Sequence, residues 1–241
     1  MKGTKSRKNG CTCPFHLFQI VVIVYFFVNI SLFGVFWIPG FTSITALMVV
    51  GITIYGGLSI LQMIIYIILS CVDHTDRYIK LKRSHPEEFD RYQKAKTLNY
   101  CQVCLTNVSK HAKHCKRCNK CVNNFDHHCK AINNCVAGKY YGLFIFFIII
   151  SILTSLFQIA MIILDYSCLN FFVRNNFKKN FKTDLYDIAL CLLTFNVLTN
   201  ALALMYLFYL LIFHFYLMAN GMTTYEYILS RKNKIETEKV F

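Results

Sequence analysis

Charged residues are scarce in this 241-residue sequence, which carries only 12 acidic and 26 basic side chains. They make up 16% of the chain, against about 25% in an ordinary soluble protein. Internal repeats and low-complexity tracts are also absent, so the sequence does not indicate a repeat protein or a linker. Hydrophobic residues, by contrast, make up 56% of the chain. A conventional soluble domain is therefore not expected.

Charge is absent altogether from four apolar stretches, which are Leu17–Ile38, Ile44–Cys71, Leu143–Leu164 and Ile188–Phe213. Each is 22 to 28 residues long, and about 20 helical residues cross the hydrocarbon core of a bilayer. A soluble helix of this length would show a polar stripe, whereas these show only scattered Asn, Gln, Ser and Thr. The sequence therefore predicts an all-α integral membrane protein with four transmembrane helices.

The basic residues indicate the orientation of these helices. Of the 26 Lys and Arg, 22 lie before the first span, between the second and third, or after the fourth. The positive-inside rule places these segments in the cytosol. The predicted layout is a cytosolic N-terminus (1–16), helices 1 and 2 (17–71), a cytosolic segment (72–140), helices 3 and 4 with a lumenal loop at 165–187 (141–213), and a cytosolic tail (214–241).

Seven of the twelve cysteines lie between Cys101 and Cys135, in the predicted cytosolic segment. The cytosol is reducing, so a disulfide framework is not expected there. Metal binding or catalysis is the better interpretation of such a cluster. Cys11 and Cys13 lie just before the first span, where juxtamembrane cysteines can be lipidated, and ordinary thiols are the favoured interpretation.

Counting the possible metal ligands shows that the cluster holds more donors than two zinc sites need. Tetrahedral zinc takes four Cys or His ligands and commonly starts from a Cys-x2-Cys pair. The candidate donors are Cys101, Cys104, His114, Cys115, Cys118, Cys121, His127, His128, Cys129 and Cys135, with His111 a weaker one. Two closed sites need eight ligands, so about two donors are left over. The count does not decide whether the two ligand sets follow one another or are interleaved.

His127 and Cys129 are the best pair to be left over, because Asp126 stands beside them. A thiol becomes a nucleophile as its thiolate, which needs a base or a positive charge nearby. An imidazole can be that base, and a carboxylate can fix its tautomer. Asp126, His127 and Cys129 therefore predict an activated nucleophile between metal ligands.

The run Cys-x2-Cys-x9-His-Cys-x2-Cys-x2-Cys-x4-Asp-His-His-Cys-x5-Cys resembles the DHHC-type protein S-acyltransferases, or palmitoyltransferases. The downstream Thr223-Thr224-Tyr225-Glu226 resembles the family's Thr-Thr-x-Glu motif. The resemblance implies a palmitoyl-CoA:protein-cysteine acyltransferase. Cys129 would take the acyl group from a fatty acyl-CoA, and a cysteine of a target protein would then receive it.

The resemblance also implies roles for individual residues. One structural zinc ion would take Cys101, Cys104, His114 and Cys121, and a second would take Cys115, Cys118, His128 and Cys135. Thr224 would contact Asp126, and Asn134 lies in the family's Asn-Asn-Cys run. Lys130 and Lys139 are candidates for contacting the phosphates of CoA.

The implied setting is an endomembrane, the endoplasmic reticulum or the Golgi, with the active site in the cytosol. The expected partners are membrane lipid, acyl-CoA, and cytosolic or membrane-associated proteins with juxtamembrane cysteines. Nucleic acid is not expected, because aromatic residues that stack on bases are sparse among the lysines of 101–121.

The sequence departs from the family in three respects, one of which is that it stops at Phe241 without the longer tail of many members. The family commonly has Pro-Trp or Lys-Trp after the nucleophile, where this chain has Lys130-Ala131, and the lost aromatic is expected to loosen acyl-chain packing or substrate approach. After the second helix an Asp-Pro turn is replaced by Asp73-His74-Thr75. The alternative function is therefore a catalytically weak or inactive membrane adaptor that keeps the zinc-bound domain for protein interaction.

Overall fold

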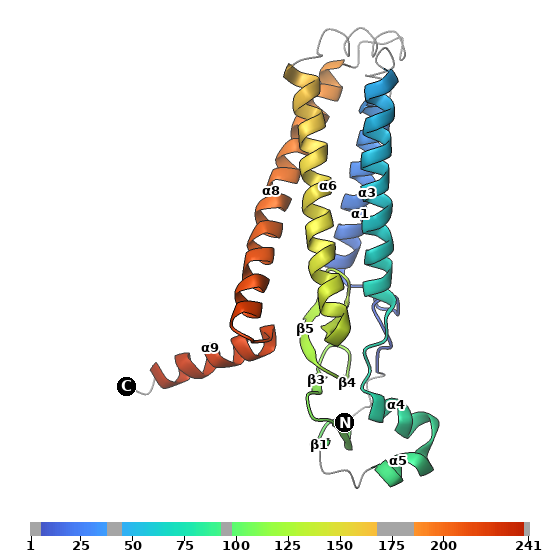
Figure 1. Cartoon of the computed structure of the whole chain (residues 1–241), viewed down its shortest axis with the longest axis vertical. Coiled ribbons are helices and arrows are strands. Elements are labelled where there is room, and N and C mark those ends of the chain that lie inside the picture. Colours follow the sequence, from blue (N-terminus) through green and yellow to red (C-terminus); the bar gives the residue numbers. More distant parts are fainter. Residues whose placement is uncertain (1–5, 38–44, 93–97, 168–185, 239–241) are drawn as a thin grey trace. The chain divides into compact units, whose positions relative to one another are not determined.

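The computed structural model describes residues 6–37, 45–92, 98–167 and 186–238, which are mostly helical (Figure 1). Contacts divide the chain into two compact units. The first unit comprises Met1–Ile20, Tyr66–Ile145 and His214–Phe241. The second unit comprises Val21–Ile65 and Phe146–Phe213.

Within the described residues, four helices are long and apolar enough to cross a membrane, which confirms the predicted spans. They are α1 (Leu17–Leu32), α3 (Thr45–Cys71), α6 (Tyr141–Ser167) and α8 (Tyr186–Ala219). A short π-helix, η1 (Phe33–Trp37), continues α1. The connection between the first two predicted spans and most of the predicted loop 165–187 lie outside the described residues.

The second unit contains a buried network of polar side chains. The Oδ1 atom of Asn29 in α1 accepts hydrogen bonds from Asn196 (3.0 Å) and Asn200 (2.8 Å) in α8. Gln158 of α6 donates to Asn196 (3.0 Å), and the Tyr25 hydroxyl donates to Asn200 (2.8 Å). In hydrocarbon such groups need each other as partners, so the network joins α1, α6 and α8.

The first unit folds the cysteine-rich segment as three antiparallel hairpins. They pair β1 (Leu98–Cys101) with β2 (Thr106–Ser109), β3 (Lys113–Cys115) with β4 (Lys120–Val122), and β5 (Phe125–Cys129) with β6 (Asn134–Ala137). The sequence shows no strand periodicity here, because strands of three to five residues are too short to establish one.

Short helices complete the first unit. Asp76 caps α4 (Arg77–Ser84) by accepting from the Tyr78 N–H at 3.0 Å. Pro86 opens α5 (Pro86–Tyr92), and proline is favoured at the first position of a helix. A 3-10 turn, η2 (Gly138–Tyr140), precedes α6, and a Thr223–Glu226 capping box starts α9 (Thr224–Glu238).

One asparagine and one aspartate side chain tie the cysteine-rich segment to the end of α3. The Asn134 amide donates to the carbonyls of Leu69 (2.9 Å) and Val72 (2.8 Å), which the helix end leaves unpaired. Asp73 accepts from the Thr75 N–H (2.9 Å) and from the buried Lys120 ammonium (2.9 Å). Hydrogen bonds thus organise the turn at the place where the family often has Asp-Pro.

Cys11 and Cys71 form a disulfide, so the interpretation of Cys11 as an ordinary thiol is wrong. The sequence did not pair them because 60 positions separate them. Cys13 is an exposed free thiol, as expected. All seven cysteines of the cluster are free of disulfides, in agreement with the interpretation of that segment.

Candidate functional site

Four cysteine and histidine side chains meet at the β1–β2 and β3–β4 hairpins. Their ligand atoms lie within 4.8 Å of one another, and they are Cys101, Cys104, His114 and Cys121. His114 Nδ1 is 3.3 Å from the sulfur of Cys104 and 3.8 Å from those of Cys101 and Cys121. This first cluster can hold a metal ion.

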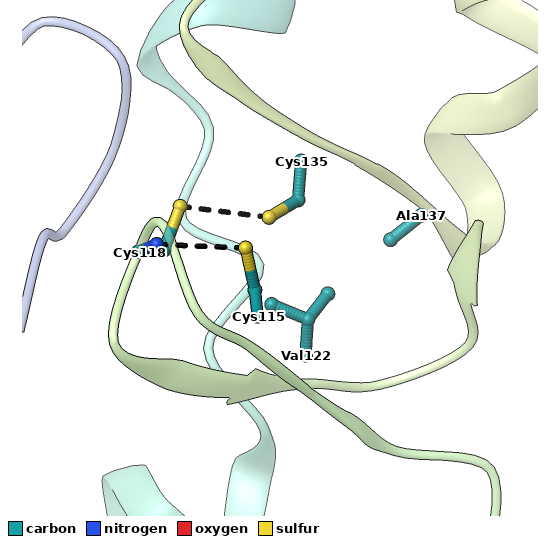
Figure 2. Packing of buried hydrophobic residues seen from close by; sticks show 5 residues of the cluster. All are labelled: Cys115, Cys118, Val122, Cys135 and Ala137. Carbon is teal, nitrogen blue, oxygen red and sulfur yellow. Dashed lines mark hydrogen bonds between the residues drawn. The ribbon is translucent and has the colours of Figure 1, made fainter. Parts of the chain in front are cut away.

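A second cluster joins the β3–β4 and β5–β6 hairpins and comprises Cys115, Cys118, His128 and Cys135. Figure 2 shows the three sulfurs turned toward one another, beside Val122 and Ala137. His128 Nδ1 is 3.3 Å from Cys118 Sγ and 3.7 Å from Cys115 Sγ. The Cys118 and Cys135 sulfurs are 3.6 Å apart. This cluster too can hold a metal ion.

The spacing of the ligand atoms fits zinc. With bonds of about 2.3 Å to sulfur and 2.0 Å to nitrogen, a tetrahedral zinc ion keeps sulfurs about 3.8 Å apart and sulfur and nitrogen about 3.5 Å apart. The contacts between ligand atoms described above run from 3.3 to 3.8 Å. Four donors surround each centre, so neither keeps an open position for a substrate.

The β3–β4 hairpin explains why the ligand sets are interleaved. His114 and Cys115 are neighbours on β3, so their side chains point to opposite faces of the strand. Cys118 lies in the turn and Cys121 on β4. The hairpin thus gives two ligands to each cluster, His114 and Cys121 to the first and Cys115 and Cys118 to the second.

Asp126, His127 and Cys129 stay outside both clusters and lie together on β5. The Asp126 Oδ2 atom is 2.7 Å from His127 Nδ1. The pairing register of β5 shifts between Phe125 and His127, which sets Asp126 in a bulge. His127 and Cys129 are two residues apart, so they share a strand face, and His128 points away to the second cluster.

The electrostatics of these three residues favour the charged pair. Burial lowers the pKa of His127, but hydrogen bonds to Asp126 and Cys129 outweigh it and raise the pKa to about 9. Burial raises the pKa of Cys129, yet the hydrogen bond and positive charge of His127 bring it below its ordinary value. Both shifts favour a thiolate beside an imidazolium, the form in which a cysteine can act as a nucleophile.

Thr224, at the start of α9, lies against Asp126 as the resemblance implied. Its N–H donates to Asp126 Oδ1 at 2.9 Å, and its hydroxyl donates to Oδ2 at 2.7 Å. Burial raises the pKa of Asp126, but the hydrogen bonds from His127 and Thr224 outweigh this and lower it. Asp126 is therefore an anion held by three donors.

The sequence did not identify His214, which packs against the other side of His127. Their rings are 5.7 Å apart, and Phe144 lies 5.4 Å from His127 and 5.3 Å from His214. The hydroxyl of Tyr141 is 2.9 Å from His214 Nδ1. A lone histidine at the end of the apolar run 188–213 is the only signal that the sequence offers for this contact.

The remaining candidates are dispersed. Lys130 is exposed next to the nucleophile, and Lys139 is exposed with its ammonium 5.2 Å above the ring of Tyr140. His111 is exposed and belongs to neither metal cluster. No described contact bears on a role for the two lysines in binding CoA.

Comparisons with known proteins agree with this site. The family model described as DHHC palmitoyltransferase matches residues 94–231, more than half of the chain. The chain is 32% identical to human palmitoyltransferase ZDHHC11, covering 95% of this chain and 61% of that protein. It is 32% identical to mouse palmitoyltransferase ZDHHC11, with 95% and 72% covered. For mouse palmitoyltransferase ZDHHC1 the identity is 30%, with 99% and 54% covered.

The chain thus spans about three fifths of the length of the human relative. The matched region begins before the first metal cluster and ends after Thr224, so it contains both clusters and the residues around Cys129. The chain belongs to the DHHC palmitoyltransferase family.

Proposed function

We propose that this chain is a protein S-palmitoyltransferase whose nucleophile is Cys129. The observation that carries the proposal is that Cys129 lies outside both metal clusters and beside the Asp126–His127 pair. The names of the relatives support the same activity. The substrates are a fatty acyl-CoA and a cysteine of a target protein.

The reaction has two steps. The Cys129 thiolate attacks the carbonyl carbon of the acyl-CoA thioester, and CoA leaves as a thiol after taking the proton of His127. Neutral His127 then accepts the proton of the target cysteine, whose thiolate attacks the acyl-enzyme and releases the Cys129 thiolate. Asp126 keeps the imidazole in one orientation and stabilises its charged form.

The two clusters would hold structural zinc, one ion with Cys101, Cys104, His114 and Cys121, and the other with Cys115, Cys118, His128 and Cys135. Bound zinc would supply a fixed scaffold, since four protein ligands fill each site. The ligands His128 and Cys135 flank Cys129 on the same hairpin. They fix the strand that carries the nucleophile, and such preorganisation speeds a reaction between bound groups.

The site lies where the first unit gathers the ends of apolar helices. Tyr66 near the end of α3 donates to the Ala131 carbonyl at 3.1 Å, and Phe144 near the start of α6 packs on His127. An acyl chain prefers hydrocarbon, whereas CoA and a target cysteine are in water. A nucleophile at this level of the membrane, on the cytosolic face of an endomembrane, can meet both.

The test is acylation of the purified full-length chain by palmitoyl-CoA, followed by intact-mass spectrometry. We expect one palmitoyl adduct, removed by hydroxylamine and mapped to Cys129. Cys129→Ser should form no adduct and transfer nothing to a peptide thiol, while its zinc content stays at that of the wild type. Cys13→Ser, which changes an exposed thiol, is the matched control and should remain fully active.

Transfer by Cys129→Ser would overturn the nucleophile. A wild-type chain that holds both zinc ions but forms no acyl-enzyme would instead favour the adaptor function.

A further inference from the structure

The N-terminal segment (residues 7–19) packs against the turn that follows Cys129. This nucleophile turn (residues 130–133) joins β5 to β6. The turn starts at the residue after Cys129, and Cys129 pairs with Asn134 at its other end, so the position of the turn sets the backbone around the nucleophile. Asn133, at the end of this turn, is contacted from more than 100 residues away in the sequence.

Asn133 connects the nucleophile turn to the N-terminal segment. Its Oδ1 accepts a hydrogen bond from the Arg7 guanidinium at 2.7 Å, and its amide donates to Gln19 Oε1 at 3.0 Å. Arg7 also donates to the Thr12 carbonyl at 2.8 Å. Asn133 is buried and has a φ of +51°, a conformation that asparagine tolerates better than most residues. Both ends of its amide group are therefore used by the N-terminal segment.

Gly10 brings the two backbones into direct contact. A Cβ atom at this position would lie 2.2 Å from the carbonyl oxygen of Ile132 and 3.1 Å from that of Asn133. The Gly10 N–H donates to the Ser70 carbonyl at 2.8 Å, and its own carbonyl accepts from Gln19 at 3.2 Å. Because the Gly10 N–H and carbonyl are both hydrogen-bonded, the segment cannot easily move away to make room for a larger side chain at position 10.

Independent anchors fix the N-terminal segment itself. The Arg7 N–H donates to the Cys118 carbonyl at 2.9 Å, and the Lys8 carbonyl accepts from the buried Lys120 ammonium at 2.6 Å. The Asn9 amide donates to the Cys71 carbonyl, at the end of α3, at 2.7 Å. The segment is thus tied to the second metal cluster's hairpin and to α3, the same elements that surround the nucleophile turn.

We propose that residues 7–19 are a positioning element for Cys129, acting through Arg7 and Gly10 on the nucleophile turn. This inference rests on the proposed acyl transfer for its kinetic consequence, but not for its structural one. The segment fixes the backbone of Ile132 and Asn133, in the turn that directly follows the nucleophile. A displacement of about 1 Å in a reacting group can cost about 100-fold in rate, so losing this support should be visible in catalysis.

The kinetic test compares Gly10→Ala with Gly142→Ala, a glycine whose added Cβ would meet no atom within 4 Å. We expect Gly10→Ala to slow acyl-enzyme formation at saturating palmitoyl-CoA by about tenfold or more. The KM should change little, and zinc content should stay at the wild-type value. Gly142→Ala should behave as the wild type.

A second variant tests the same positioning role in case Gly10→Ala does not fold. Arg7→Ala removes the bonds to Asn133 and Thr12 and should slow acyl-enzyme formation by about tenfold or more, the worth of a charged hydrogen bond. Arg7→Lys should recover part of this rate, because an ammonium can still donate to Asn133. Arg83→Ala, which removes an exposed cation on α4, is the control. Wild-type rates in both Gly10→Ala and Arg7→Ala would overturn the proposal.

A structural readout separates this proposal from the proposed function. Hydrogen exchange of the Ala131 and Ile132 amides, followed by mass spectrometry, requires no acyl chemistry. We expect Arg7→Ala to exchange them about tenfold faster than the wild type and Arg83→Ala to leave them unchanged. Unchanged exchange in Arg7→Ala would overturn the positioning role, whereas a wild-type chain that forms no acyl-enzyme would overturn only the acyl transfer.

Discussion

Asp126 and Thr224, 98 positions apart in the chain, are joined by two hydrogen bonds of 2.9 and 2.7 Å. The second of these shares the carboxylate oxygen that meets His127. The first turn of α9 therefore helps to fix the carboxylate that orients the imidazole. Residues beyond the fourth span thus belong to the site as much as the cysteine-rich segment does.

Removing the Thr224 hydroxyl should weaken the proposed reaction. A hydrogen bond to a charged group contributes about 1.5–3 kcal/mol, so Thr224→Val should slow acyl-enzyme formation by about tenfold or more. Thr224→Ser keeps the hydroxyl and should stay within about twofold of the wild type. Single-turnover acylation with labelled palmitoyl-CoA measures both. Thr237→Val, an exposed residue whose hydroxyl bonds only to carbonyls of α9 itself, is the control, and equal rates for Thr224→Val and the wild type would contradict the prediction.

His214 should matter through the ring of His127. His214→Ala leaves a gap against His127 and Phe144, and we expect acyl-enzyme formation to fall by about tenfold, since the imidazole loses a fixed orientation. His214→Phe keeps an aromatic ring there and should lose less. Zinc content by metal analysis should stay constant in both variants. The exposed His111→Ala is the control, and a larger loss in His214→Phe than in His214→Ala would argue against ring packing.

The buried polar network of the second unit should contribute to stability. Asn29→Ala removes an acceptor shared by Asn196 and Asn200. Interhelical hydrogen bonds in membranes contribute about 0.6 kcal/mol on average and up to about 1.7, so a loss of about 1–3 kcal/mol is expected. Thermal unfolding in detergent measures it. Thr53→Ala loses only a bond to its own helix at Val49 and should unfold close to the wild type. A wild-type unfolding temperature for Asn29→Ala would refute the network's contribution.

His74 should make the fold sensitive to mild acid. Burial and, to a smaller extent, Lys120 lower its pKa to about 4, so the folded state favours the neutral ring. The stability that this provides is present above the ordinary pKa near 6.5 and is lost as the pH falls toward about 4. Between about pH 7 and pH 5, the wild type should lose on the order of 1–2 kcal/mol more than His74→Gln.

Denaturant unfolding at each pH gives that difference, and subtracting the variant removes the contribution of protonated metal ligands. The exposed His85→Gln should follow the wild type. Identical pH dependence in the wild type and His74→Gln would show that His74 is not the group responsible.

The features of this molecule that depend on short-range sequence patterns could be predicted from the sequence. Charge-free stretches indicated four spans, and close spacing of cysteine and histidine indicated two ligand sets with Cys129 outside them. The count left open how the ligands pair. That pairing depends on neighbours such as His114 and Cys115 pointing to opposite faces of a strand too short to recognise.

Contacts between segments far apart in the sequence could not be predicted from it, for a physical reason. Gly10 is needed because another backbone passes within van der Waals distance, and nothing near Gly10 in the sequence reveals that backbone. The same holds for Arg7, which meets Asn133 from 126 positions away, and for the Cys11–Cys71 disulfide. Single polar residues in such places look like ordinary surface groups until the chain is folded.

The shared β3–β4 hairpin has a consequence for how the chain acquires its metal. Because this one hairpin supplies half of each ligand set, the first ion to bind would order two of the four ligands that the second ion needs. Uptake would then be cooperative, since the ordering cost of the hairpin is met once for both ions. Under zinc scarcity a population of these chains would divide into fully loaded and empty molecules, with few carrying a single ion.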